Sequence, residues 1–141
     1  MKPAIVTGAF GALGRAVVSE LMAQGFSVAA VDKAEAPAGF PATLSLGNID
    51  LIDDAGVAAV YARIADELGP IAGLVNVAGG FVWEPVGGGS VESWDRMYAI
   101  NLKTAIISTR SALPHLASAA AIVNVGAAAA IQPGMGMAPY A

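Results

Sequence analysis

Short apolar segments alternate along the chain with longer segments whose apolar residues recur at helical spacing. Residues 26–31 and 71–75 are typical of strands that are buried on both faces. Between them, residues 54–68 place Val57 and Ile64 on one face of a helix. This alternation predicts an α/β fold, with a doubly wound parallel sheet and right-handed crossovers. The expected strands are residues 4–6, 26–31, 43–46, 71–75 and 121–125, and the expected helices are 15–24, 54–68 and 90–113.

The composition excludes several classes of protein. Hydrophobic residues make up 56% of the 141 residues, yet no apolar run approaches the length that spans a bilayer, and no signal-peptide pattern opens the chain. The absence of cysteine excludes disulfides and thiolate catalysis and is typical of a cytoplasmic protein. The net charge of -4 shows no basic patch for nucleic acid, and a single histidine, His115, argues against a histidine-built metal site.

A glycine-rich segment, residues 7–14, leaves the first expected strand and enters the first expected helix. Glycines let a backbone turn tightly and approach a pyrophosphate, and a helix N-terminus presents free N–H groups to phosphates. The segment therefore predicts a dinucleotide site, although the same glycines also suit an ordinary turn. The candidate binding residues are Gly8, Gly11, Ala12, Leu13 and Gly14.

Asp32 ends the second expected strand, 24 residues after Gly8. In dinucleotide-binding folds, an acidic residue roughly 20 residues after the glycines binds the ribose hydroxyls of the adenosine. A carboxylate there also repels the additional phosphate of NADP, so the position favours NAD, and Lys33 beside it weakens that preference. A solvated aspartate in a turn is the alternative interpretation.

These residues resemble the short-chain dehydrogenase/reductase family, whose glycine pattern is Thr-Gly-x-x-x-Gly-x-Gly. The chain matches this pattern at Thr7, Gly8 and Gly14, and it has Ala12 at the middle glycine with Gly11 beside it. The resemblance implies a Rossmann-type fold and an NAD(H)-dependent oxidoreductase. Such an enzyme moves hydride between the nicotinamide and a small carbonyl, alcohol or similarly activated substrate. The resemblance also implies a homodimer or homotetramer.

Two further segments extend the resemblance to the cofactor site. Asp50-Leu51 stands where the family places an aspartate against the adenine ring. Residues 76–79, Asn-Val-Ala-Gly, are similar to the Asn-Asn-Ala-Gly of the family, which stabilises the central sheet and lies beside the cofactor. By this resemblance the cofactor site also includes Asp50, Leu51, Asn76, Ala78 and Gly79.

The catalytic residues are inferred from the same resemblance. Asn101-Leu102 resembles the helix that carries the catalytic asparagine, and Tyr140-Ala141 resembles the start of Tyr-x-x-x-Lys. Tyr140 is then the general acid/base for the substrate oxygen, and Asn101 holds a water in the proton path. A tyrosine, with an ordinary pKa of about 10, needs a positive charge nearby to act near neutral pH. In the family this charge comes from the lysine four residues further on and from the oxidised nicotinamide.

Two departures from the family pattern bear on activity. The family's catalytic serine lies 13 residues before the tyrosine, and Ala127 stands at that position here. Losing one such donor costs about a hundred- to a thousandfold in rate. The sequence also stops before the lysine position, and this kind of sheet usually continues to a sixth strand. Residues 1–141 are therefore interpreted as one dinucleotide-binding domain that is truncated at its C-terminal end and inactive as given.

Three interpretations of the function stay open, and the missing serine bears on the first two. Dihydropteridine reductases also have an alanine-rich segment there and an Ala-Gly-Gly like residues 78–80, which is consistent with an activated substrate. A catalytically inactive NAD-binding module or structural subunit is an alternative from a different class. A nucleotide-sugar epimerase of the extended branch is the third, and the Asn-Val-Ala-Gly segment argues against it.

Overall fold

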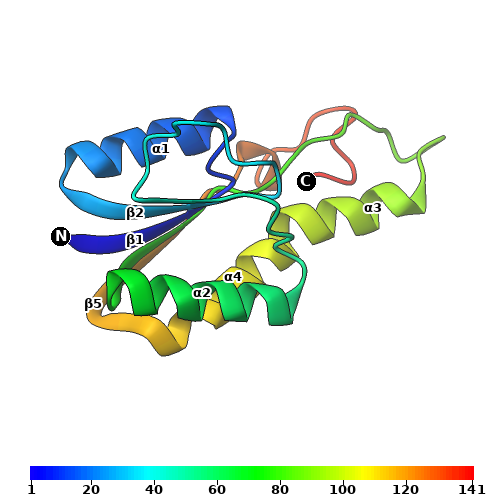
Figure 1. Cartoon of the computed structure of the whole chain (residues 1–141). Helices are drawn as coiled ribbons and strands as arrows, with labels where there is room; N and C mark the ends of the chain where they lie inside the picture. Colours follow the sequence, from blue (N-terminus) through cyan, green and yellow to red (C-terminus); the bar gives the residue numbers. More distant parts are fainter.

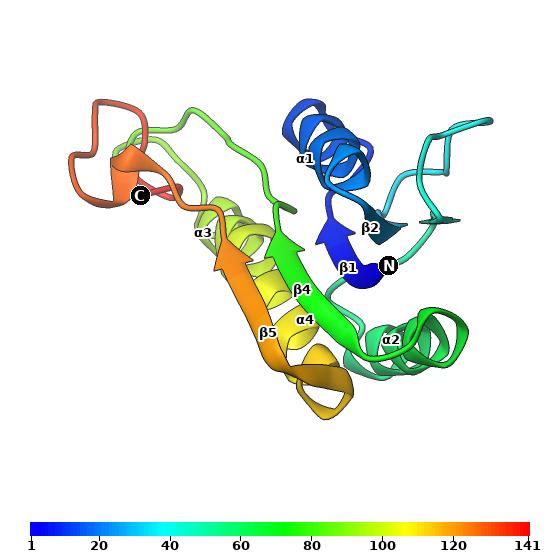
Figure 2. The ribbon, with the colours of Figure 1, turned by 90° about the vertical axis from the view of Figure 1, so that its left-hand side faces the viewer.

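A computed structural model describes residues 1–141 and contains one sheet of five parallel strands (Figures 1 and 2). The strands lie in the order β3-β2-β1-β4-β5, so the chain reverses its direction of travel across the sheet between β1 and β4. This is the predicted doubly wound α/β architecture. The bounds are Lys2–Thr7 for β1, Phe26–Val31 for β2, Leu44–Leu46 for β3, Ile71–Asn76 for β4 and Leu116–Asn124 for β5.

Helices cover both faces of the sheet. One face carries α1, and the other carries α2 and α4, as the end-on view shows (Figure 2). α3 continues into α4 and projects beyond the sheet toward the chain's C-terminus (Figure 1). The bounds are Ala12–Ala23 for α1, Asp54–Leu68 for α2, Val91–Tyr98 for α3 and Thr104–Ala112 for α4. None of these helices combines the length and the apolar character that crossing a membrane requires.

The core lies on both sides of β1 and β2, because successive side chains of a strand point to opposite faces. Ile5 of β1 packs into one cluster with Tyr61 and Ile64 of α2. Its neighbour Val6 packs into a second cluster with Val18 of α1. Both strands are almost entirely buried, as expected of a parallel sheet that is covered by helices.

The helix expected over residues 90–113 is interrupted. Ser90 caps α3, since its hydroxyl accepts a hydrogen bond of 3.3 Å from the Ser93 N–H. A π-helical turn, Ala99–Lys103, then separates α3 from α4. A 3-10 turn over Leu113–His115 follows the end of α4. Single π turns inside α-helices occur frequently at functional sites. Helical periodicity did not reveal this one.

Most observed bounds lie within two residues of the prediction, but α1 and β5 each begin three or more residues earlier, for physical reasons. α1 begins at Ala12 rather than residue 15, because the glycine-rich turn leads directly into the helix at its N-cap, Gly11. β5 begins at Leu116 rather than residue 121, where it pairs with Ile71 of β4 across a register shift. The alanine-rich start of this strand has a composition that is depleted in strands, so it gives little signal.

Candidate active site

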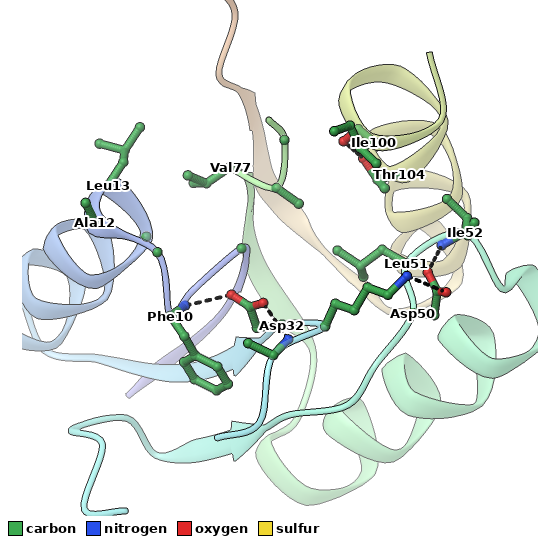
Figure 3. Close-up of a pocket in the computed structure, with 17 residues that line it drawn as sticks. Phe10, Ala12, Leu13, Asp32, Asp50, Leu51, Ile52, Val77, Ile100 and Thr104 are labelled. Atoms are coloured by element: carbon green, nitrogen blue, oxygen red, sulfur yellow. Dashed lines mark hydrogen bonds and ion pairs between the residues drawn. The ribbon is translucent and has the colours of Figure 1, made fainter. Parts of the chain in front are cut away.

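Two pockets adjoin each other at the carboxyl ends of the strands, the edge where open α/β sheets bind ligands. The larger has a volume of about 570 Å³ and lies between the turn after β1, the end of β2 and the segment before α2 (Figure 3). The smaller has a volume of about 380 Å³ and lies between the loops that follow β4 and β5. Both fall within the size range of small-molecule sites. Val77, Ala78 and Gly79 line both pockets, so these residues form a shared wall.

The glycine-rich turn is held so closely that two of its glycines have no space for a side chain. Gly8 has φ +62°, and a Cβ there would lie 2.8 Å from the backbone of Ala78. A Cβ on Gly14 would overlap the Gly8 carbonyl. A Cβ on Gly11 would make only an ordinary contact, 3.5 Å from the Gly8 carbonyl oxygen, so close approach does not require glycine there.

The start of α1 suits a phosphate. Gly11 caps the helix without any side-chain hydrogen bond, so no side chain covers its first N–H groups. Those groups have no partner within a helix and carry the positive end of its dipole. Ala12, Leu13 and Gly14 line the pocket at this helix end. A close-approach turn followed by an open helix N-terminus therefore fits the pyrophosphate of a dinucleotide.

Asp32 lines the same pocket, between the glycine-rich turn and the Asp50 segment (Figure 3). One carboxylate oxygen accepts a 2.8 Å hydrogen bond from the Phe10 N–H, and the other accepts a 2.9 Å bond from the Ala34 N–H. Each oxygen of a carboxylate has two acceptor sites, so one site on each remains for ribose hydroxyls. Asp32 thus joins the end of β2 to the glycine-rich turn while keeping capacity for a ligand.

Asp50 and Lys33 form an ion pair of 3.0 Å on another side of the pocket. The hydrogen bond from the Lys33 ammonium, with that from the Ile52 N–H, holds the pKa of the Asp50 carboxyl below its ordinary range despite some desolvation. Both side chains are largely exposed, so the pair contributes little to stability. Leu51 beside it is only 4% exposed and provides an apolar surface in the pocket.

Asn76 is part of the sheet rather than of the pocket lining. Its Nδ2 donates hydrogen bonds of 2.8 Å to Asn124 Oδ1 and 3.3 Å to Thr109 Oγ1, which tie β4 to β5 and to α4. Nearby, the buried Thr7 hydroxyl accepts the N–H groups of Val77 and Ala78 at 3.1 and 3.2 Å. These bonds fix the shared wall, where the predicted Ala78 and Gly79 line both pockets.

The smaller pocket brings together the three positions that the sequence resemblance assigned to catalysis: Asn101, Ala127 and Tyr140. Asn101 lies in the π-helical turn, and its amide pairs with the backbone of Gly80, accepting the N–H at 2.9 Å and donating to the carbonyl at 3.0 Å. The ring of Tyr140 stacks edge-on against Phe81, with 5.0 Å between centroids.

The structure brings most of the predicted site residues to one or other of the two pockets. All of the predicted cofactor residues except Asn76 line the larger pocket. Some lining residues were not assigned, although they neighbour assigned ones in sequence or lie one helical turn further. In the larger pocket these are Phe10, Lys33, Ala34, Ile52, Val77, Ile100 and Thr104, and in the smaller one Val77, Gly80, Phe81, Val125, Gly126 and Ala130.

Comparison with known proteins decides the family. Residues 2–141 match the family described as short chain dehydrogenase. This chain belongs to that family. The predicted resemblance is confirmed, and short chain dehydrogenases are oxidoreductases that bind nicotinamide cofactors.

Relatives and solved structures agree with this assignment. The chain is 34% identical, over an alignment 157 positions long, to the 2,3-dihydro-2,3-dihydroxybenzoate dehydrogenase of Bacillus subtilis, covering 99% of this chain and 58% of that protein. It is 36% identical over 93 residues to the inactive 2-(S)-hydroxypropyl-CoM dehydrogenase 2 of Xanthobacter autotrophicus, covering 64% of this chain and 40% of that protein. The ligand-free aldohexose dehydrogenase of Thermoplasma acidophilum superimposes with a TM-score of 0.90 at 26% identity, covering 99% of this chain and 54% of that one. The chain thus spans somewhat more than half the length of the Bacillus and Thermoplasma proteins.

Proposed function

We propose that the protein containing this chain is an NAD(H)-dependent oxidoreductase acting on a small carbonyl, alcohol or similarly activated substrate. The observation that carries the proposal is the shared wall formed by Val77, Ala78 and Gly79. On one side of it lie the glycine-rich turn and Asp32, and on the other lies Tyr140. A dinucleotide that extends along the larger pocket to this wall ends beside the tyrosine.

The larger pocket offers residues that can bind each part of the adenosine half of a dinucleotide. Gly8 and the first turn of α1 receive the pyrophosphate, and Asp32 receives the adenosine ribose hydroxyls. Asp50 and Leu51 border the adenine. The Asp32 carboxylate repels a phosphate on that ribose, which is the reason for proposing NAD rather than NADP. When bound, the nicotinamide donates or accepts hydride.

In the smaller pocket, we assign the transfer of the proton to and from the substrate oxygen to Tyr140. Its hydroxyl donates a proton to the substrate oxygen in reduction and takes it back in oxidation, as a general acid/base. Asn101 ties the loop after β4 to the π-helical turn through Gly80, and we assign to it the holding of a water in the proton path. Ala127 offers no hydroxyl to polarise a carbonyl. We therefore propose that the substrate is activated by its own structure, or that turnover of a simple carbonyl is slow.

A second function is favoured by one specific observation. Ala127 stands at the serine position, and one relative is named as an inactive dehydrogenase. The alternative is therefore a catalytically inactive NAD-binding module or structural subunit of the same fold. This protein would bind the dinucleotide in the larger pocket and turn nothing over.

One experiment separates the two functions. The whole natural protein is assayed for NADH oxidation against a panel of small carbonyls and quinonoid compounds, with Tyr140→Phe beside it. Turnover that falls by about a hundredfold or more in the variant supports the enzyme, because general acid/base groups contribute about 10²–10⁴ in rate. Tyr61→Phe removes a tyrosine hydroxyl at a buried position outside both pockets and is the matched control. NADH binding without any turnover supports the binding module.

We also propose that the protein forms a homodimer or homotetramer. α3, the π-helical turn and α4 carry exposed apolar side chains three or four residues apart, which is the spacing of one helix face. An exposed apolar stripe of this kind marks a protein–protein contact. It consists of Val91, Trp94, Tyr98, Leu102 and Ile106, which are between 42% and 74% exposed.

A further inference from the structure

The loop after β4 contacts the segment that carries Tyr140 through main-chain pairing. The N–H of Glu84 donates a hydrogen bond of 2.7 Å to the carbonyl of Gly136, and Glu84 and Met137 form an isolated parallel bridge. These residues lie about fifty positions apart in sequence. The loop and the tyrosine segment are therefore joined at one point, although neither belongs to the sheet.

The side chain of Glu84 fixes the same point to α3. Its carboxylate accepts hydrogen bonds from the Ser90 N–H and from the Ser93 hydroxyl, both at the start of that helix. These bonds hold the pKa of the Glu84 carboxyl below its ordinary value, the Ser93 hydroxyl being the larger cause. An anion at a helix N-terminus is also stabilised by the helix dipole. Glu84 thus links the tyrosine segment, through its backbone, to a rigid helix, through its carboxylate.

Trp83 closes the contact from the other side. Gly136 has φ +77°, which favours glycine, and a Cβ there would overlap the Trp83 indole ring. The indole therefore lies against the backbone of Gly136, while Trp83 as a residue remains 62% exposed. A side chain at position 136 would separate the loop from the tyrosine segment.

Tyr140 lies one turn further along the chain from this contact. The Tyr140 N–H donates a 3.1 Å hydrogen bond to the Met137 carbonyl, so a single turn joins Tyr140 to the residue that pairs with Glu84. The ring of Tyr140 then packs edge-on against Phe81, which belongs to the same loop as Glu84. Such aromatic pairs contribute about 0.5–1.5 kcal/mol beyond the burial of their apolar surface. This is too little to hold the Tyr140 ring in place unless the backbone that carries it is also held.

We propose that Glu84 is a positioning residue that holds the Tyr140 hydroxyl at the smaller pocket, by joining the tyrosine segment to the start of α3. The consequence for catalysis rests on the proposed function, since it requires Tyr140 to be the acid/base. The effect of Glu84 on the position of the Tyr140 ring does not depend on that function. Displacing a catalytic group by about 1 Å can cost about a hundredfold in rate.

The test places 3-fluorotyrosine at position 140 of the whole natural protein and records its 19F NMR signal. Glu84→Ala is expected to shift or broaden this signal and to lower kcat ten- to a hundredfold, with the Kd for NADH unchanged because Glu84 does not line the larger pocket. Glu92→Ala removes the same charge from the first turn of α3 and is the control, expected to change neither readout. Phe81→Leu removes the adjacent ring and establishes that the probe senses its surroundings. Should Glu84→Ala not fold, Glu84→Gln keeps one acceptor oxygen and is expected to give a smaller shift in the same direction.

The outcomes separate the two proposals. An unchanged fluorine signal in Glu84→Ala, with or without a fall in the melting temperature, overturns the positioning role and leaves Glu84 as a helix cap. A changed signal with undiminished kcat supports the positional consequence and overturns the catalytic one, because the displaced tyrosine would not matter to the reaction. A changed signal in a protein that has no turnover even in its natural form supports the positioning role and refutes the proposed function.

Discussion

The backbone N–H of Phe10 donates a 2.8 Å hydrogen bond to the carboxylate of Asp32, across 22 positions of sequence. The bond joins the glycine-rich turn after β1 to the end of β2. Asp32 therefore has two tasks in the larger pocket: it shapes the turn that approaches the pyrophosphate, and it offers acceptors to the ribose. The substitution of this residue is expected to affect both.

Asp32→Ala should weaken NADH binding about tenfold to a hundredfold, since hydrogen bonds to a charged group are worth about 1.5–3 kcal/mol. The same change should narrow the preference for NADH over NADPH, because the repelling carboxylate is gone. Fluorescence titration of the whole protein with both cofactors measures the two effects. Glu35→Ala, an exposed acidic residue three positions away, is the control. Unchanged NADH affinity in Asp32→Ala would remove the reason for proposing NAD.

Gly8→Ala and Gly25→Ala form a matched pair for the close approach of the turn. Both glycines have positive φ, +62° and +82°, so both variants pay a left-handed strain of about 1–2 kcal/mol. Only Gly8 would also press its Cβ against the backbone of Ala78, whereas nothing lies within 4 Å of Gly25. We expect Gly8→Ala to lower the free energy of unfolding further than Gly25→Ala and to weaken NADH binding at least tenfold. Equal effects of the two changes, measured by urea unfolding and cofactor titration, would contradict the close approach.

Local signals explain which elements could be predicted from the sequence. The predicted bounds of α2 agree with the structure because Asp53 accepts a hydrogen bond from the Gly56 N–H at its start and Gly69, with φ +94°, ends it. Both signals lie within a few residues of the helix. The glycine-rich turn and Asp32 could be placed for the same reason, since each ends a strand that its own apolar sequence marks.

What the sequence did not predict depends on distant partners. Asn76 belongs to a recognisable motif, yet its side chain faces Asn124 and Thr109, which lie 48 and 33 positions further on. The contact of Glu84 with Gly136 likewise joins two loops that no periodicity connects. The π-helical turn changes the helix by one hydrogen-bond step, which is too small a change to alter the apolar pattern.

Ala127→Ser tests whether the smaller pocket lacks only a hydroxyl. A serine there is expected to raise kcat/KM for a simple carbonyl substrate, by up to about a hundredfold, because one donor to a developing oxyanion is worth about 10²–10³ in rate. Ala129→Ser, in the 3-10 turn that directly follows Ala127 but outside the pocket lining, should leave the rate unchanged. Steady-state kinetics on the carbonyl panel gives the answer. No gain in Ala127→Ser would indicate a substrate that needs no such donor, or a protein that does not catalyse.

Leu102→Asp tests the apolar stripe of α3 and α4. A charge at this position, which is 52% exposed in the single chain, would have to be desolvated in an interface, so we expect the assembly to dissociate. Light scattering of the whole protein over a range of concentrations measures the mass. Val86→Asp, an apolar residue in the loop after β4 that is 74% exposed, is the control and should not change the mass. A natural protein that is already monomeric would refute the stripe as a contact between copies.

The Glu84 carboxylate predicts a pH dependence of stability. The Ser93 hydroxyl and the Ser90 N–H lower its pKa from the ordinary value of 4.5 in the folded chain. A group whose pKa is lower in the folded state contributes stability that is fully present above its unfolded pKa and is lost as the pH falls through its folded one. The difference in melting temperature between the natural protein and Glu84→Gln should therefore be constant down to about pH 5 and shrink below about pH 4.5. The Glu92 carboxylate accepts no such hydrogen bonds. Glu92→Gln should therefore show a smaller difference in melting temperature from the natural protein, and that difference should depend less on pH. A Glu84→Gln difference that persists unchanged at about pH 3 would mean that the carboxylate charge is not what joins the loop to α3.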